Sequence, residues 1–452
     1  EPDALAPWLG SAIRAFDDEI DEARRTVTGE IDVFDGRLVD EAAGHALYRF
    51  RVDSRVQLAP ETPVQVRRRS DIRPVAGTLV SADDSSVLVD LDGELPPSVP
   101  SARLSADAAF VLTAQRDRCR AALDRLLPPT DDADGDEESA GLPSGTADHS
   151  PPAWTRLPRL VCGIDTPRNA VGEAGAQGRG PLNESQVEAC RRGLGAELLF
   201  VWGPPGTGKT TTLGHTVADL FDAGRRVLVV THANVAVDQA LLAIASAFSE
   251  RAIPSDDDLV RVGVPSTEDA RRRPDLLAHE IAARRMPDVS ERLVALGEER
   301  RALIELAWSS SGGASTSERR AEIRREMRQL REKLAKVEAA VIESAQVLAV
   351  TAARASLDKR IWAQRFDTVV VDEASVMGLA PSLLAALLGT TSILFFGDFR
   401  QLPPVVLSST DAARKLLRRD AFAASGARAS VERGGTSDSV ALLDLQYRMS
   451  AA

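Results

Sequence analysis

Two helical stretches frame the first quarter of the chain. Leu9, Phe16 and Ile20 belong to a hydrophobic pattern with spacings of three and four, which predicts a helix over residues 4–28. A helical period returns over residues 106–127. We expect these two helices to pack beside each other as a stalk.

Between the two helices, over residues 30–91, the hydrophobic period falls toward two. Strands are expected at residues 46–52, 63–68, 75–81 and 86–91. Turn residues such as Asp92 and Gly93 separate or end these stretches. Because short consecutive strands close readily on themselves, the pattern predicts a small antiparallel β-barrel.

The second half of the chain carries a different kind of strand, short and continuously apolar. Such runs occupy residues 198–203, 226–231, 368–371 and 392–397 and are separated by helical stretches. Runs that are apolar on both faces are typical of the buried parallel strands of an α/β sheet. The fold class predicted for this part is therefore α/β.

A long helical segment interrupts the predicted sheet. Residues 281–306 have a helical period, residues 309–317 read as a loop, and a heptad seam follows. The seam is formed by Ile323, Met327, Leu330, Leu334, Val337 and Val341. This pattern predicts an inserted antiparallel helical hairpin. The hairpin is either a structural insertion packed on itself or a guide for nucleic acid or a partner.

The segment at residues 128–152 is rich in acids and holds Leu142 as its one large apolar residue, so we expect a disordered linker there. The resulting organisation has four parts. Residues 1–127 form the stalk and barrel, 128–152 the linker, 153–280 and 342–452 the α/β domain, and 281–341 the hairpin.

Composition excludes several classes of protein. The sequence contains no run of 18 apolar residues and no secretory signal pattern, so a membrane span is not expected. Its three cysteines form no CxxC pair, which argues against a disulfide framework, a zinc site or an iron–sulfur cluster. A reducing cytoplasm is the expected compartment.

The charge balance is unusual in its detail. The net charge is −12, and only 5 of the 55 basic residues are lysines, the first of them Lys209. Aspartate outnumbers glutamate, 39 to 28. An acidic, aspartate-rich surface suits a halophile, and a high-GC coding sequence also favours arginine over lysine. We expect a haloarchaeal source, or else a high-GC bacterium, and an acidic body of this kind can still carry a basic groove.

The strongest chemical signal is the sequence GPPGTGKT, which follows an apolar strand and precedes a helical stretch. It matches the phosphate-binding loop of ATP-binding proteins. Glycines let backbone N–H groups turn toward phosphate oxygens, Lys209 faces the β and γ phosphates, and Thr210 ligates Mg²⁺. The predicted ATP-binding residues of the loop are Gly203, Pro204, Pro205, Gly206, Thr207, Gly208, Lys209, Thr210 and Thr211.

A second strand ends in two acids, within the sequence TVVVDEAS. Asp372 is placed to hold Mg²⁺, and Glu373 to polarise the attacking water. Alone, an apolar strand followed by two acids could equally be a strand-end cap. Together with the phosphate loop upstream, it indicates hydrolysis of ATP.

Further motifs follow in order across residues 182–450, and together they resemble the first motor domain of superfamily 1 helicases. The branch is the one related to the nonsense-mediated-decay helicase and the DNA-replication helicase/nuclease. The motifs are PLNESQ, VVTHANVAVDQ, VLAVTAARA, LFFGDFRQLPPVV and LLDLQYRM. The resemblance implies a RecA-like parallel sheet and ATP-driven movement on nucleic acid.

The resemblance also implies roles for individual residues. Gln186 would read the adenine edge, Gln401 would sense the γ phosphate, Tyr447 would stack on the base and Arg448 would face the γ phosphate. Thr231, Asn234 and Thr351 would touch the nucleic-acid backbone. The catalytic set is then Lys209, Glu373, Gln401 and Arg448.

The position of the barrel bears on direction. Because the barrel precedes the phosphate loop, the arrangement resembles the 5′→3′ branch, with the barrel as domain 1B and the hairpin as domain 1C. The family continues past its QYRM motif into a second RecA-like domain, so we expect this chain to be a fragment. Such a fragment would bind nucleotide but show little steady ATP turnover, because translocation needs two lobes.

Two other functions stay open at this stage. A nucleotide-gated clamp would bind a strand or a protein without productive turnover. A chromosome-maintenance ATPase would explain the coiled coil between its two nucleotide motifs, but residues 347–368 contain no glycine-bearing signature of that class. Single-stranded DNA is the favoured track over RNA, and nothing in the sequence names a protein partner.

Overall fold

The computed structural model divides the chain into two compact units. The first comprises residues 1–27, 109–261 and 345–452, and the second comprises residues 28–108 and 262–344. The structure describes residues 4–27, 29–42, 45–53, 56, 58–69, 71, 74–92, 95–127, 152–170, 182–253, 257–309, 314–433 and 437–447. No helix in these ranges is long and apolar enough to cross a membrane.

The second unit begins with a closed antiparallel barrel. Its strands are β1 (Glu30–Ala42), β2 (His45–Arg51), β3 (Pro63–Arg67), β4 (Val75–Ala82), β5 (Ser86–Leu91) and β6 (Ser98–Ala106). They pair in the order β1-β2-β5-β4-β3-β6, and β6 returns to β1. Phe50, Val66, Leu79 and Leu104 are fully buried, as the period of two requires. The predicted barrel is confirmed.

The sequence pattern gave four of the six barrel strands and did not resolve β1 and β6 as strands. Strand β1 carries Asp32, Asp35 and Gly36, and β6 carries Pro100 and five serine or alanine positions among its nine residues. Those residues have low strand propensity. Pairing of β1 with β6 closes the barrel and outweighs that local preference.

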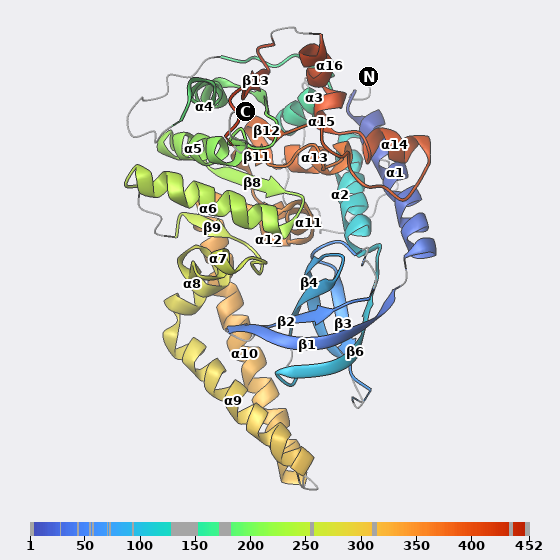
Figure 1. Cartoon of the computed structure of the whole chain (residues 1–452), viewed down its shortest axis with the longest axis vertical. Coiled ribbons are helices and arrows are strands. Elements are labelled where there is room, and N and C mark those ends of the chain that lie inside the picture. Colours follow the sequence, from blue (N-terminus) through green and yellow to red (C-terminus); the bar gives the residue numbers. More distant parts are fainter. Residues whose placement is uncertain are drawn as a thin grey trace. The chain divides into compact units, whose positions relative to one another are not determined.

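The helical insertion follows in the same unit. It contains α7 (Glu268–Arg271), α8 (Ala278–Arg285), α9 (Pro287–Ser309) and α10 (Ala314–Ser344). Helices α9 and α10 form the predicted hairpin (Figure 1). Ile323, Met327 and Leu334 of the seam pack against Leu293 and Leu296 of α9. One detail of the prediction was wrong: helix α8 ends before α9 begins at a proline, which cannot donate a helical hydrogen bond.

The first unit is built on a seven-stranded parallel sheet. The strands are β7 (Leu198–Trp202), β8 (Val227–Thr231), β9 (Leu259–Arg261), β10 (Val347–Thr351), β11 (Phe366–Val371), β12 (Gly389–Gly397) and β13 (Val440–Leu442). Their order is β13-β7-β12-β11-β8-β10-β9. All residues of β7, β8 and β10 are buried. The predicted α/β sheet is confirmed, with β9, β10 and β13 added to the four expected strands.

Helices cover both faces of this sheet (Figure 1). Helices α5 (Lys209–Asp222) and α6 (Asn234–Glu250) pack together on one face, and α3 (Arg156–Val161) and α13 (Leu379–Ala386) pack on the other. Besides the two predicted stalk helices, this unit also contains α4 (Glu184–Gly195), α11 (Ala352–Leu357), α12 (Lys359–Trp362), α14 (Asp411–Leu416), α15 (Ala421–Ala424) and α16 (Ala427–Glu432). Because every strand is parallel, all carboxyl ends lie at one edge, where α/β proteins bind ligands.

The two predicted stalk helices are present as α1 (Ala6–Thr26) and α2 (Phe110–Leu126), and they pack against each other. Both belong to the unit that holds the parallel sheet. Helix α1 also packs against α14. The expected linker at residues 128–152 lies outside the described residues, apart from Pro152.

Candidate nucleotide site

The phosphate loop connects β7 to α5 and has the backbone that its sequence requires. Gly206 and Gly208 have φ angles of +85° and +80°, in the left-handed region that glycine tolerates best. Lys209 begins α5 and is only 9% exposed. Its Nζ donates a 2.8 Å hydrogen bond to the carbonyl oxygen of Gly203, which holds the ammonium inside the loop.

The other predicted loop residues surround this lysine. The Thr207 hydroxyl donates to the Pro204 carbonyl at 2.8 Å and so fixes the turn. Thr210 lies in the first turn of α5 and is partly exposed, whereas Thr211 is exposed. The N-terminus of a helix with inward-facing N–H groups favours a bound phosphate.

Asp372 and Glu373 follow β11 at the same sheet edge. Asp372 is buried, and its pKa is raised to about 7, first by burial and then by the neighbouring charge of Glu373, while Lys209 acts in the opposite direction. The Glu373 N–H donates to Asp372 Oδ1 at 2.9 Å. Glu373 has a φ of +51°, an uncommon value for a residue with a side chain. Strain of this kind is often kept at functional sites.

Strand β12, which lies between β7 and β11 in the sheet, supplies the third part of the site. After β12, Asp398 accepts hydrogen bonds from Trp202 Nε1 at 2.9 Å and from the Arg400 N–H at 3.1 Å. Gln401 Nε2 donates to Asp398 Oδ2 at 3.3 Å. Asp398 thus joins the predicted sensor to the strand that carries the phosphate loop. Sequence reasoning quoted this aspartate within its motif but gave it no role.

Gln186 lies beside the loop and is already partly engaged. Its Nε2 donates to the Thr207 carbonyl at 3.1 Å, and its Oε1 accepts from the Asn183 N–H at 2.9 Å. Asn183 caps α4 in return, which completes a capping box. By count, each amide atom of Gln186 keeps one further donor or acceptor position, although only 3% of the residue is exposed.

The segment after β13 closes over the same loop. The Tyr447 N–H donates to the Gly206 carbonyl at 2.8 Å, and Gln446 Nε2 donates to the Pro205 carbonyl at 2.8 Å. The Tyr447 hydroxyl accepts from Asn183 Nδ2 at 2.9 Å, and the side chain is 55% exposed. Tyr447 and Gln186 therefore lie near one another at the phosphate loop. Arg448 lies outside the described residues.

The three predicted nucleic-acid contacts are placed differently from that expectation. Thr231, Asn234 and Thr351 are 0%, 3% and 1% exposed. The Thr231 hydroxyl donates to the Ala233 carbonyl, and the Thr351 hydroxyl caps α11 by accepting from the Arg354 N–H at 3.0 Å. The structure therefore gives all three side chains internal roles, and strand contact by them finds no support in the described residues.

The reason for the burial of Asn234 is an arginine that sequence reasoning missed. Arg261, on β9, is fully buried. Its Nε donates to Asp238 Oδ1 at 2.7 Å, and its Nη2 donates to Asn234 Oδ1 at 2.8 Å. This ion pair ties β9 to the first turns of α6.

A second missed contact holds the segment after Gln401. Glu19 of α1 is 6% exposed, and its two carboxylate oxygens accept the backbone N–H groups of Leu407 and Ser408, each at 2.8 Å. The hydroxyl of Thr410 donates to Asp18 Oδ2 at 2.6 Å. No motif marks these two acids, which lie on the helix predicted only as a stalk.

The residues present suit one magnesium ion shared with a nucleotide. The described part of the chain has no cluster of three or more His, Cys, Asp or Glu side chains that could hold a metal by itself. Mg²⁺ in ATP-hydrolysing proteins needs only one or two protein ligands beside the phosphates. Buried Asp372 and the hydroxyl of Thr210 would be such ligands, and a cation would relieve the cost of ionising that carboxyl group.

Comparison with known proteins adds independent evidence. A family model described as an AAA domain matches residues 181–409. DNA polymerase alpha-associated DNA helicase A of Schizosaccharomyces pombe is 33% identical over 232 residues, 50% of this chain and 33% of that protein. DNA-binding protein SMUBP-2 of Mesocricetus auratus is 31% identical over 283 residues, 60% of this chain and 26% of that protein.

A third relative is the ATP-dependent helicase upf1 of Schizosaccharomyces pombe, which is 31% identical over 244 residues. These residues make up 52% of this chain and 23% of that protein. The chain therefore spans a third or less of the length of the curated relatives that it matches here.

Proposed function

The chain belongs to the AAA domain family and carries a superfamily 1 helicase ATPase domain similar to upf1, and on that basis we propose that it couples hydrolysis of Mg-ATP to movement along a single strand of nucleic acid. One observation supports this most directly. The phosphate loop, the acid pair and the sensor glutamine follow three adjacent strands, β7, β11 and β12, at one edge of the sheet.

Each of these residues that the structure describes has a task that fits its position, and Arg448 takes the role that the resemblance implies. Lys209 binds the β and γ phosphates, the backbone of the glycine-rich loop cradles them, and Glu373 orients and polarises the attacking water. Gln401 contacts the γ phosphate, and Arg448 opposes its charge. Tyr447 stacks on the adenine base while Gln186 bonds to its edge. Catalysis rests on positioning and charge stabilisation, because phosphoryl transfer needs little covalent chemistry from the protein.

Magnesium belongs to this proposal. Thr210 and Asp372 would hold the ion, which supplies charge neutralisation across the phosphate oxygens when bound. Asp372 must be ionised to serve as a ligand, and its raised pKa makes that step dependent on the metal near neutral pH.

Single-stranded DNA is the proposed track. Two of the relatives carry DNA in their names, as a DNA helicase and a DNA-binding protein. The direction proposed is 5′→3′, because the barrel precedes the phosphate loop in the chain, as in the branch that the sequence resembles. The acidic, lysine-poor composition adds a proposal of a salt-rich cytoplasm, so assays belong in both low and molar KCl.

The test of the nucleotide site separates binding from hydrolysis. We expect Lys209→Ala to abolish Mg-ATP affinity measured by calorimetry, and Glu373→Gln to keep that affinity while slowing hydrolysis by at least a hundredfold. Lys415→Ala, which removes an exposed lysine on α14, is the matched control and should change neither quantity. Equal loss of binding in Glu373→Gln and Lys209→Ala would sink the assignment.

The affinity for nucleic acid is tested separately, by fluorescence anisotropy with labelled single-stranded DNA and RNA. Tighter binding of DNA is expected, and its affinity should depend on the bound nucleotide. Nucleotide-dependent strand binding together with unchanged hydrolysis in Glu373→Gln would instead identify a clamp. The salt series matters because phosphate contacts weaken steeply with ionic strength.

A further inference from the structure

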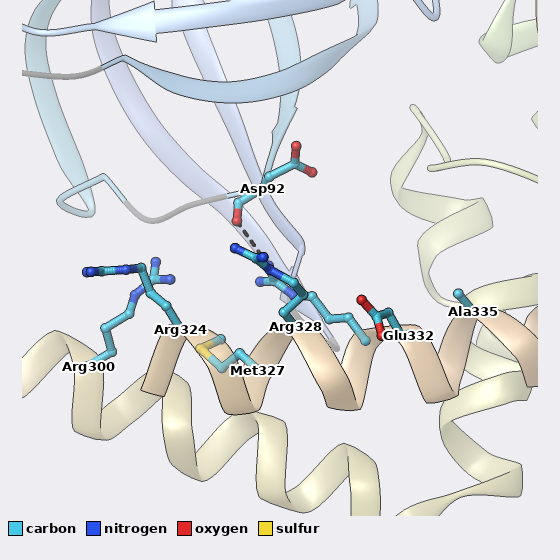
Figure 2. Close-up of a pocket in the computed structure, with 8 residues that line it drawn as sticks. Asp92, Arg300, Arg324, Met327, Arg328, Glu332 and Ala335 are labelled. Carbon is cyan, nitrogen blue, oxygen red and sulfur yellow. Dashed lines mark hydrogen bonds between the residues drawn. The ribbon is translucent and has the colours of Figure 1, made fainter. Parts of the chain in front are cut away.

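The unit formed by the barrel and the hairpin contains a pocket of about 420 Å³ with an unusual lining. Figure 2 shows that it lies along one side of α10, opposite Asp92 of the barrel. The lining residues are Asp92, Arg300, Arg324, Met327, Arg328, Arg331, Glu332 and Ala335. The lining thus holds four guanidinium groups and two carboxylates, in a chain whose net charge is −12.

The helix itself sets the spacing of these charges. Arg324, Arg328 and Arg331 lie at positions i, i+4 and i+7 of α10, which places them on one face over roughly 10 Å. Arg300 reaches the pocket from α9. Arg331 Nη1 donates to the Asp92 carbonyl at 3.3 Å and so fixes one side of the pocket.

Two other arginines of this hairpin are held by acids. Arg292 pairs with Glu326 at 2.7 Å, and Arg319 pairs with Glu299 at 2.6 Å. Arg324 and Arg328 differ, because both are exposed and no ion pair or hydrogen bond holds either of them within the described part of the chain. Two unpaired cations on one face raise the local potential and attract an anion.

We propose that this arginine-lined pocket binds consecutive phosphate groups of a single-stranded nucleic acid, and this inference rests on the function proposed above. A guanidinium group pairs with phosphate through two parallel hydrogen bonds. Arg324 and Arg328 lie one turn apart on α10, so together they offer donors to neighbouring phosphate groups rather than to one ion. Exposed Ala335 adds a small apolar surface beside the charges, which suits the sugar of a nucleotide.

The experiment compares two double variants of equal charge change. Arg324→Glu/Arg328→Glu reverses the pocket, whereas Arg325→Glu/Lys333→Glu reverses two exposed cations of α10 that do not line it. Affinity for labelled single-stranded DNA and RNA is measured by fluorescence anisotropy across a KCl series, with Mg-ATP affinity by calorimetry on the same samples. All four positions are exposed, so folding should be preserved, and Arg324→Gln/Arg328→Gln serves as a milder second variant.

The pocket variant should lose at least tenfold in strand affinity, and its slope of log affinity against log salt should fall by about two. The control should lose less than threefold, and Mg-ATP affinity should be unchanged in both. Equal losses in the two variants, or no loss in either, would overturn the inference and leave the proposed function standing. The inference would also be overturned if the pocket variant kept its affinity for single-stranded nucleic acid and selectively lost binding to a poly-glutamate peptide. That result would indicate a protein partner. Absence of strand binding by the unsubstituted chain at every salt concentration, with Mg-ATP binding intact, would remove both proposals.

Discussion

Replacement of Arg261 by methionine tests the buried ion pair that ties β9 to α6. The guanidinium group is fully buried, as is Asp238, and Asn234 is 3% exposed. Methionine has a similar length and no charge, so Arg261→Met removes the hydrogen bonds to Asp238 and Asn234 while filling most of the space. It leaves the Asp238 carboxylate buried without its cation.

The expected cost follows from that uncompensated charge. Breaking a buried ion pair by removing one partner costs about 3–5 kcal/mol. The carbonyl oxygen of the Asn234 side chain also loses its donor, which belongs to the same cost and adds about 1 kcal/mol at most. We therefore expect Arg261→Met to lower the free energy of unfolding by roughly 4 kcal/mol.

A double-mutant cycle isolates the pair. Asp238→Leu alone leaves Arg261 buried without this carboxylate. Arg261→Met/Asp238→Leu replaces the whole pair with apolar groups, so it should lower the free energy of unfolding by much less than the sum of the two single variants. Urea denaturation followed by tryptophan fluorescence is suitable, because Trp154, Trp202 and Trp362 lie in the same unit as the pair. A cost below about 1 kcal/mol for Arg261→Met, or additive costs in the cycle, would refute this reasoning.

Two further predictions concern stability. The folded-state pKa of Asp372 is about 7, above its ordinary value of 3.8. Without metal, the folded protein therefore binds one more proton than the unfolded chain between about pH 4 and 7, and its free energy of unfolding falls as the pH rises through that window. Asp372→Asn should therefore raise the melting temperature at pH 8 more than at pH 4, and an equal change at both would contradict this. Gly214 of α5 lies where an added Cβ would come within 2.5 Å of the Ala243 carbonyl oxygen of α6, so Gly214→Ala should cost about 1–3 kcal/mol in urea denaturation. Gly10→Ala on α1, where a Cβ meets only the end of Arg14 at 3.8 Å, is the control and should stabilise slightly; similar costs for the two would exclude the steric explanation.

Much of the fold could be predicted because local pattern and final burial agree. The apolar runs that became β7, β8, β11 and β12 are buried on both faces, and the heptad seam of α10 packs as expected through Ile323, Met327 and Leu334. Where the local sequence pattern and the final burial disagree, the element could not be predicted. Strand β9 has three residues, one of them the charged Arg261, and no sequence period can reveal so short a buried element.

The nucleotide site shows the same division. The phosphate loop and the acid pair could be predicted because their chemistry requires particular residues at fixed spacing. Asp398 and Glu19 were missed because their partners lie far away in sequence. Asp398 accepts from the Trp202 side chain, and Glu19 accepts from the backbone N–H groups of Leu407 and Ser408. Contact of Thr231, Asn234 and Thr351 with nucleic acid was expected from the family resemblance. A hydroxyl or amide at such a position can equally cap the following helix or join an ion pair.

The contact between Glu19 and the segment after Gln401 has a consequence for sequence variation. Its two acceptor oxygens bind backbone N–H groups, which every residue except proline provides. Substitution at Leu407 or Ser408 therefore leaves the contact intact, whereas substitution of Glu19 removes it. Among relatives that keep helix α1, an alignment should show an invariant acid at the position of Glu19 and no proline at the positions of Leu407 and Ser408.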